Sequence, residues 1–215
     1  HHPMAATSST RETILAKIRR ALAQPVPLPF PKQDAGGELY PTAKEDLTVV
    51  FAQEFTRLLG NFAYAENAND LIHQIRELIA GRGWKEVFCS EDALRTLLSP
   101  DGAQPFSSLP LESSDVSITS CEALVARTGS MVLSARTGGR TASVYAPVHI
   151  CIALTSQLVF DVKDALQLLK AKYPQGIPSQ VSFATGPSRT ADIEKTLVVG
   201  VHGPKEVYCF LLEDQ

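Results

Sequence analysis

Apolar residues recur at two different spacings along the chain, and the alternation of the two spacings predicts an α/β protein. Short apolar runs typical of strands are separated by longer segments in which apolar residues recur every three or four positions, which is typical of helices. The segments that we expect as strands are residues 62–64, 86–89, 116–119, 131–133, 142–145, 148–154, 181–184 and 197–201. Because strands and helices alternate at short spacing, we expect a Rossmann-like, mostly parallel sheet flanked by helices.

The segments with helical spacing begin at residue types that favour helix N-termini. Helices are expected from Ser9, Thr42, Ser90 and Asp161, and over residues 71–79. A short helix is also expected over residues 120–126, and it would end in a turn at residues 127–130. Another is expected to begin at Ser188, directly after a turn imposed by Gly186 and Pro187.

A proline-rich spacer separates the first helix from the rest of the chain. Prolines at positions 25, 27, 29 and 31 exclude a helix and favour a stiff, extended segment. We therefore divide the chain into a tag remnant at residues 1–3, a helical arm with its spacer at residues 4–40, and one α/β domain at residues 41–215. The arm is amphipathic, so it needs a partner, which is its own domain, a second copy of the chain or another protein.

Composition and charge exclude several classes of partner. A chain of 215 residues with 44% hydrophobic residues is long enough for one substantial core. A net charge of −3 gives no general attraction for nucleic acid or an anionic membrane. No apolar run reaches the roughly 20 residues that span a bilayer, so we expect a cytoplasmic protein without a membrane span.

The cysteines do not have the spacing of a metal site. Cys89, Cys121, Cys151 and Cys209 are far apart, each has apolar or small neighbours, and no CxxC motif occurs. We expect buried, reduced thiols, no metal ligands, and no cofactor bound by this chain.

The densest candidate chemistry lies in residues 182–204, SFATGPSRTADIEKTLVVGVHGP. Gly186, Ser188 and Arg189 follow the end of a strand, where backbone N–H groups, a hydroxyl and a guanidinium suit a carboxylate or phosphate. An ion pair with Asp192 or Glu194 is the competing use of the arginine. His202 follows the next apolar run on a turn, so His202, Glu194 and Asp192 are the candidate groups for proton transfer.

Two further candidates lie earlier in the chain. Thr128, Gly129 and Ser130 combine two hydroxyls with a flexible backbone, as in a cradle for an anionic substrate, although a structural turn has the same composition. His149 is either a substrate-binding residue or a hydrogen-bonded core histidine. The sequence has no HExxH motif, no assignable Ser-His-acid triad and no nucleotide-binding glycine fingerprint.

Two pairs of motifs resemble a known family. Four short segments resemble signatures of the LUD domain proteins, the lactate utilization protein C family. The first pair is GPSRTADIE and VGVHGP, and the second pair is ARTGSMVLS followed by RTASVYAPVHI. The resemblance implies a fold related to ribose-5-phosphate isomerase A and the CoA transferases. It also implies a non-cluster subunit of a bacterial L-lactate oxidising complex, whose two partner subunits carry the iron-sulfur clusters.

Two other functions stay open on the sequence. The first is a free-standing isomerase or acyl-transferase-like enzyme that acts on a small anionic substrate. The second is a non-catalytic scaffold that binds its partners through the N-terminal arm. Self-association into a homodimer is compatible with each of the three.

Overall fold

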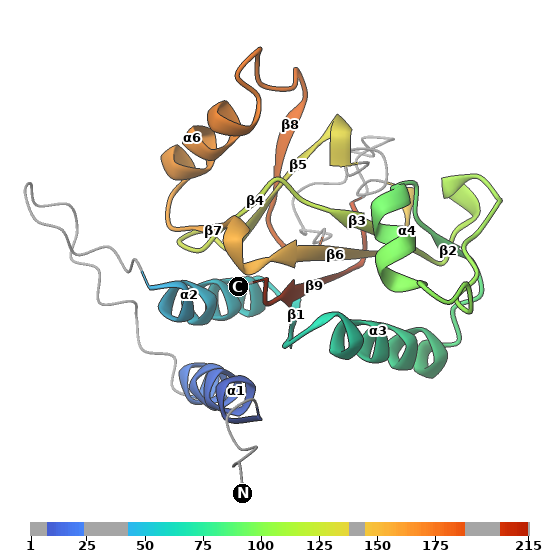
Figure 1. The fold of residues 1–215 in the computed structure, drawn as a ribbon, viewed down its shortest axis with the longest axis horizontal. Coiled ribbons are helices and arrows are strands. Elements are labelled where there is room, and N and C mark those ends of the chain that lie inside the picture. Colours follow the sequence, from blue (N-terminus) through green and yellow to red (C-terminus); the bar gives the residue numbers. More distant parts are fainter. Residues whose placement is uncertain (1–7, 24–42, 138–144, 188–202, 215) are drawn as a thin grey trace, which may run out of the picture.

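The computed structural model of the chain describes residues 8–23, 43–137, 145–187 and 203–214. Within these residues, two β-sheets pack together and are flanked by helices (Figure 1). The helices are α1 (Ser8–Ala23), α2 (Lys44–Arg57), α3 (Ala68–Arg82), α4 (Asp92–Leu98) and α6 (Val162–Lys172), with the short 3-10 turns η1 (Leu111–Ser113), η2 (Ala135–Thr137) and η3 (Thr155–Gln157). The strands are β1 (Asn61–Ala65), β2 (Val87–Phe88), β3 (Val116–Ser120), β4 (Ala123–Val125), β5 (Ser130–Ser134), β6 (Val148–Leu154), β7 (Leu158–Val159), β8 (Val181–Ala184) and β9 (Glu206–Leu212).

The larger sheet is parallel throughout and has the strand order β1-β9-β6-β3-β2. Helices α3 and α4 cover one face, where they pack on Ile118, Ile150 and Phe210. Helix α2 and the second sheet cover the other face, where they pack on Cys151 and Cys209. Burial on both faces explains why the central strands β6 and β9 are almost continuously apolar. The predicted class, an α/β protein with a mostly parallel sheet flanked by helices, is confirmed.

The second sheet has the order β7-β4-β5-β8, in which β5 is antiparallel to both of its neighbours, β4 and β8, and β7 is parallel to β4. It shows that the helix expected over residues 120–126 was wrong, since β3 ends at Ser120 and β4 follows. Leu124 faces the main core, whereas Ala123 and Val125 face α6. A short apolar run buried on both sides has no period that distinguishes strand from helix, and here pairing with β5 decides.

The N-terminal arm packs on the α/β domain of its own chain. Ile14 and Ile18 of α1 are buried in the same core cluster as Phe51 and Phe55 of α2. The expected start of α2 at Thr42 was wrong, because the N-cap is Ala43, which makes no side-chain cap bond. Among the described helices, none is long and apolar enough to cross a membrane.

Three expected segments are not covered by the described residues. These are most of the strand expected at residues 142–145, the helix expected from Ser188 and the strand expected at residues 197–201. In contrast, β9 was not among the predicted strands, although it pairs with both β1 and β6 in the larger sheet.

Two glycine turns rest directly on the C-terminal half of α2. Gly129 has a φ of +63°, and a Cβ atom there would lie 2.8 Å from the backbone nitrogen of Phe55. Gly186 has a φ of +69°, and a Cβ atom there would lie 2.4 Å from the carbonyl oxygen of Leu58. Both turns therefore require glycine for backbone conformation and for close approach.

We expect Gly129→Ala to destabilise the protein more than Gly102→Ala. Gly102 has a similar φ of +71°, but nothing lies within 4 Å of the position that a Cβ atom would take, so only the backbone strain of about 1 kcal/mol applies there. At Gly129 the contact with α2 should add about 1–3 kcal/mol. Urea denaturation followed by the fluorescence of Trp84, the only tryptophan, measures both losses. Equal losses of unfolding free energy in the two variants would show that α2 shifts to accommodate the new methyl group at residue 129.

Candidate functional site

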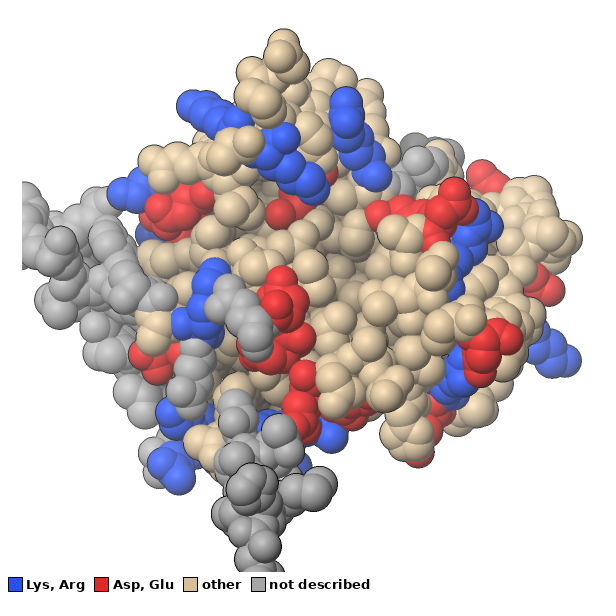
Figure 2. Space-filling view, in the orientation of Figure 1, with Lys and Arg blue, Asp and Glu red and all other residues tan. Residues whose placement is uncertain are grey.

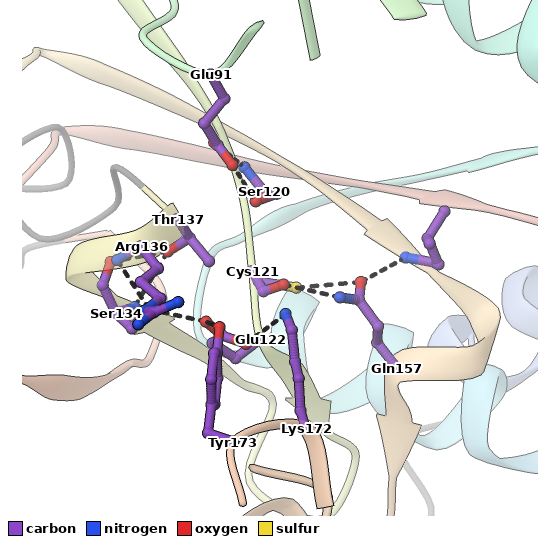
Figure 3. Close-up of polar contacts among 11 residues, drawn as sticks. Glu91, Ser120, Cys121, Glu122, Ser134, Arg136, Thr137, Gln157, Lys172 and Tyr173 are labelled. Carbon is purple, nitrogen blue, oxygen red and sulfur yellow. Dashed lines mark hydrogen bonds and ion pairs between the residues drawn. The ribbon is translucent and has the colours of Figure 1, made fainter. Parts of the chain in front are cut away.

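Two polar clusters occupy opposite ends of the hairpin formed by β4 and β5. At the turn end, the hydroxyl oxygens of Thr128 and Ser130 lie 2.7 Å apart. At the open end, the carboxylate of Glu122 is the centre of a hydrogen-bond network (Figure 3). The turn end was predicted from the sequence, whereas the open end was not.

The turn end brings together sequence motifs that are far apart in the chain. In the pairing of β5 with β8, Met131 lies opposite Ala184, so the turn at residues 128–130 lies beside Thr185 and Gly186. Four predicted binding residues, Thr128, Gly129, Ser130 and Gly186, therefore share one location on α2. The other candidates of this stretch, Ser188, Arg189, Asp192, Glu194 and His202, lie outside the described residues.

His149 lies inside the core on β6. Its Nε2 atom is 2.7 Å from the hydroxyl oxygen of Thr119 on the neighbouring strand β3, and only 1% of the residue is exposed. Burial lowers the pKa of His149 to about 4, so the imidazole is neutral at physiological pH. This geometry matches the hydrogen-bonded core histidine, and a substrate-binding role stays a prediction.

At the open end, Glu122 is a buried carboxylate that three side chains satisfy. Its side chain is 0% exposed and accepts hydrogen bonds from Ser134 Oγ at 2.8 Å, Lys172 Nζ at 2.8 Å and Tyr173 Oη at 2.7 Å. Burial pushes its pKa up, but Lys172 and the two hydroxyl donors outweigh burial and hold the pKa below its usual value. Glu122 is therefore an ionised group that ties together β4, β5 and the end of α6.

The network continues to two cations near one aromatic ring. The backbone N–H of Arg136, in η2, donates to Ser134 Oγ at 3.1 Å. The guanidinium carbon of Arg136 lies 5.1 Å from the centre of the Tyr173 ring, and Lys172 Nζ lies 5.3 Å from it. Within the described ranges, the side chain of Arg136 makes no ion pair and no hydrogen bond.

Glu91 adds a second carboxyl group at the carboxyl end of β3. It stands at the N-cap position of α4, yet it accepts hydrogen bonds from the backbone N–H of Ser120, at 2.8 Å, and from the Ser120 hydroxyl instead of capping the helix. Burial raises the pKa of Glu91 although the bonds from Ser120 oppose the shift. Glu91 and Glu122 therefore have pKa values shifted in opposite directions, a pattern that separates an acid from a base in many active sites.

This region is also the point where the chain changes sides of the sheet. After β2 the chain enters α4 on one face of the larger sheet, and after the neighbouring strand β3 it enters the second sheet on the other face. In open parallel sheets, ligands bind at the carboxyl ends of strands where the connections diverge in this way. Gln157 of η3 contacts the segment that follows β3, since its side-chain amide donates to the carbonyl oxygen of Cys121 at 2.7 Å.

Sequence reasoning missed Glu91, Glu122, Arg136 and Lys172, and each of the two glutamates had a local explanation. Glu91 fits a helix start, and Glu122 fell within the helix expected over residues 120–126. A usable signal was present in the sequence, since both glutamates follow strand ends within three residues.

The four cysteines are all buried and free, which confirms the expectation of reduced, buried thiols. Burial raises the pKa of Cys89 to about 11, so this thiol stays protonated. Within the part of the chain that the structure describes, no group of three or more His, Cys, Asp or Glu residues is arranged to hold a metal ion.

Fold and site together define an α/β domain whose open parallel sheet carries ionisable side chains at its carboxyl edge. The LUD domain family matches residues 108–212. The lactate utilization protein C of an Exiguobacterium species is 30% identical over 97% of this chain and 98% of its own length. That of Bacillus subtilis is 36% identical over 48% of this chain and 45% of its own length. The chain therefore belongs to the lactate utilization protein C family of LUD domain proteins.

A solved structure supports the fold independently. The crystal structure of a DUF162 family protein from Deinococcus radiodurans superposes with a TM-score of 0.61 and 18% sequence identity, covering 80% of this chain and 99% of that one. The kinship with ribose-5-phosphate isomerase A and the CoA transferases stays an expectation.

We expect Lys172→Met to lower the free energy of unfolding by about 1–3 kcal/mol at pH 7, because it leaves the buried carboxylate of Glu122 without its cation. The folded-state pKa of Glu122 is lowered, so its contribution to stability is present above the pKa of the unfolded carboxyl group and is lost as the pH falls. The difference in the free energy of unfolding between wild type and Lys172→Met should therefore shrink below about pH 4.

Lys170→Met on the exposed side of the same helix is the matched control, and it should change stability by less than about 0.5 kcal/mol. Urea titrations at several pH values measure both variants. A pH-independent loss in Lys172→Met would contradict an ionised Glu122.

Proposed function

We propose that this protein acts in lactate utilization, as the subunit of an L-lactate oxidising complex that binds no iron-sulfur cluster itself. The observation that carries the proposal is the relationship to a lactate utilization protein C over nearly the whole of both chains. Two partner subunits would carry the clusters and the electrons, and the complex would work in the cytoplasm.

The cysteines support this division of labour. Iron-sulfur clusters are held by thiolates, usually from closely spaced cysteines. Here all four thiols are buried, and Cys121, Cys151 and Cys209 belong to the packed core between the sheets. A cluster would require that core to open.

The contribution of this subunit would be to bind the small anionic substrate. The turn at residues 128–130 and Gly186 meet on α2, as an anion site built from the two family motifs requires. Arg189 and Ser188 belong to the second of these motifs, and His202, Glu194 and Asp192 are the proposed proton-transfer groups.

A free-standing enzyme for a small anionic substrate is the second candidate. The opposite pKa shifts of Glu91 and Glu122 favour it, because an isomerase needs one carboxyl group that holds a proton and one that does not.

Deleting the gene in the native host should abolish growth on L-lactate and leave growth on glucose unchanged. The full-length chain, supplied with an affinity tag, should restore growth and copurify with two iron-sulfur proteins after culture on lactate. Undiminished growth of the deletion strain on L-lactate would exclude the proposed role. Restored growth with a purified chain that has no partner and interconverts a sugar phosphate would favour the free-standing enzyme.

The purified chain should stay colourless after anaerobic incubation with iron and sulfide, because its thiols are buried and that of Cys89 is protonated. Visible absorption of the chain after gel filtration measures the outcome. A stoichiometric visible chromophore on the chain would mean that it carries a cluster after all.

A further inference from the structure

One ion pair of α2 lies beside the two glycine turns that rest on this helix. A Cβ atom at Gly129 would lie 3.1 Å from the Cβ atom of Glu54. Gly186 packs against Leu58, which is four residues after Glu54 and therefore on the same side of the helix. Arg57 is three residues after Glu54, so it borders this side, and its guanidinium lies 3.0 Å from the Glu54 carboxylate. The pair therefore adjoins the turn at residues 128–130.

The two members of this pair are buried to very different degrees. The side chain of Glu54 is 9% exposed, whereas that of Arg57 is 66% exposed. Asp92 and Arg95 of α4 form a pair with the same spacing, but there the carboxylate is 89% exposed. Because burying a carboxylate costs free energy and an exposed pair contributes little, helix stability alone gives no reason to bury Glu54.

Each member of the pair keeps hydrogen-bonding capacity that the described residues do not use. Nε and Nη2 of Arg57 both donate to one oxygen of Glu54, Oε2, at 3.1 and 3.0 Å. A guanidinium has five N–H donors, so the edge formed by Nη1 and Nη2 stays available. Oε1 of Glu54 accepts no hydrogen bond within the described ranges. The pair therefore offers a donor edge and, next to it, one acceptor oxygen.

The turn adds hydroxyl groups but no net charge. The hydroxyl oxygens of Thr128 and Ser130 lie 2.7 Å apart, so one hydroxyl donates to the other. Arg127, directly before the turn, is paired with Asp161 at 3.2 Å, and Arg57 is likewise matched by its own carboxylate. A guanidinium that already holds one carboxylate can hold a second at its free edge, but a dianion such as phosphate would leave negative charge uncompensated.

The surface charge also favours a small ligand with a single negative charge. On the face shown in Figure 2, acidic and basic side chains are interspersed, and no extended basic area is present on it among the described residues. A ligand with several negative charges would therefore find no matching surface on this face.

We propose that Arg57 and Glu54 are the part of the turn site that recognises a short 2-hydroxy monocarboxylate. Nη1 and Nη2 of Arg57 bind the carboxylate of the ligand, and Oε1 of Glu54 accepts a hydrogen bond from its hydroxyl group. Because a carboxylate has only acceptor atoms, it bonds to a hydroxyl group but not to an oxo oxygen, so the site favours the hydroxy acid over the 2-oxo acid. The inference deepens the proposed function and rests on it for the choice of L-lactate.

Isothermal titration of the full chain at pH 7 with L-lactate, pyruvate, propionate and inorganic phosphate tests the proposal. L-lactate should bind more tightly than pyruvate and propionate, since neither of these has a hydroxyl group to donate, and inorganic phosphate should not bind. Arg57→Gln should weaken the binding of L-lactate by about tenfold, as the loss of a charge-assisted hydrogen bond predicts.

Arg95→Gln is the matched control, because it removes the same charge from a helical pair with the same spacing. Its affinity for L-lactate should stay within about twofold of wild type. Arg57→Lys separates binding from stability. It keeps a cation for Glu54, so the unfolding midpoint should stay close to that of wild type, but it loses the planar donor edge and should weaken L-lactate binding about as much as Arg57→Gln.

Glu54→Gln tests the acceptor role. The amide can still accept from Arg57, and it can also donate to an oxo oxygen. The preference for L-lactate over pyruvate should therefore disappear or reverse in this variant. A purely structural ion pair would change stability and leave the preference between the two acids as it is.

Several results would overturn the proposal. No binding of L-lactate by wild type would do so, as would equal weakening in Arg57→Gln and Arg95→Gln, or wild-type affinity in Arg57→Lys. Tight binding of inorganic phosphate would contradict the ligand class, and an unchanged preference for L-lactate in Glu54→Gln would remove the role given to Glu54. These outcomes are distinct from failure of the proposed function, which the growth of the deletion strain on L-lactate decides without reference to binding.

Discussion

A buried carboxylate organises the carboxyl edge of this protein. Removing the charge of Glu122 from water costs several kcal/mol unless donors compensate, and three side chains from β5 and the end of α6 do so. The positions of Ser134, Lys172 and Tyr173 are therefore coupled through the carboxylate of Glu122. The end of α6, the η2 turn and the start of β4 keep one arrangement because any other would leave an ionised group unpaired in the core.

The other end of the hairpin is held by a different kind of constraint. There, Gly129 and Gly186 press against the backbone of α2 and its C-cap, and a side chain at either position would overlap with them. Helix α2 is itself fixed by Phe51 and Phe55, whose rings stack 5.3 Å apart in the main core, and α1 packs against it. One end of the hairpin thus depends on charge compensation and the other on close backbone packing, and both keep polar groups in set positions.

The two ends suggest a division of chemistry within one small domain. Hydroxyls and backbone turns gather at one end, whereas carboxyl groups and cations gather at the other. Membership of the lactate utilization protein C family connects the domain with lactate utilization. The buried thiols and the neutral, hydrogen-bonded His149 fit a packed core better than a reactive site.

The sequence by itself determined the fold class, most of the helices and strands, the burial of the cysteines and the family. These depend on local periodicity, on residue types such as Asp161 at a helix start, and on motifs that are contiguous in the chain. It did not determine that residues 123–125 form a strand, since a short run buried on both faces takes its conformation from its neighbours. Nor did it determine the network of Glu91, Glu122, Arg136 and Lys172. These residues come from four segments, and only the packing of the second sheet against the first brings them together, because a hydrogen bond between distant segments has no periodic trace in the sequence.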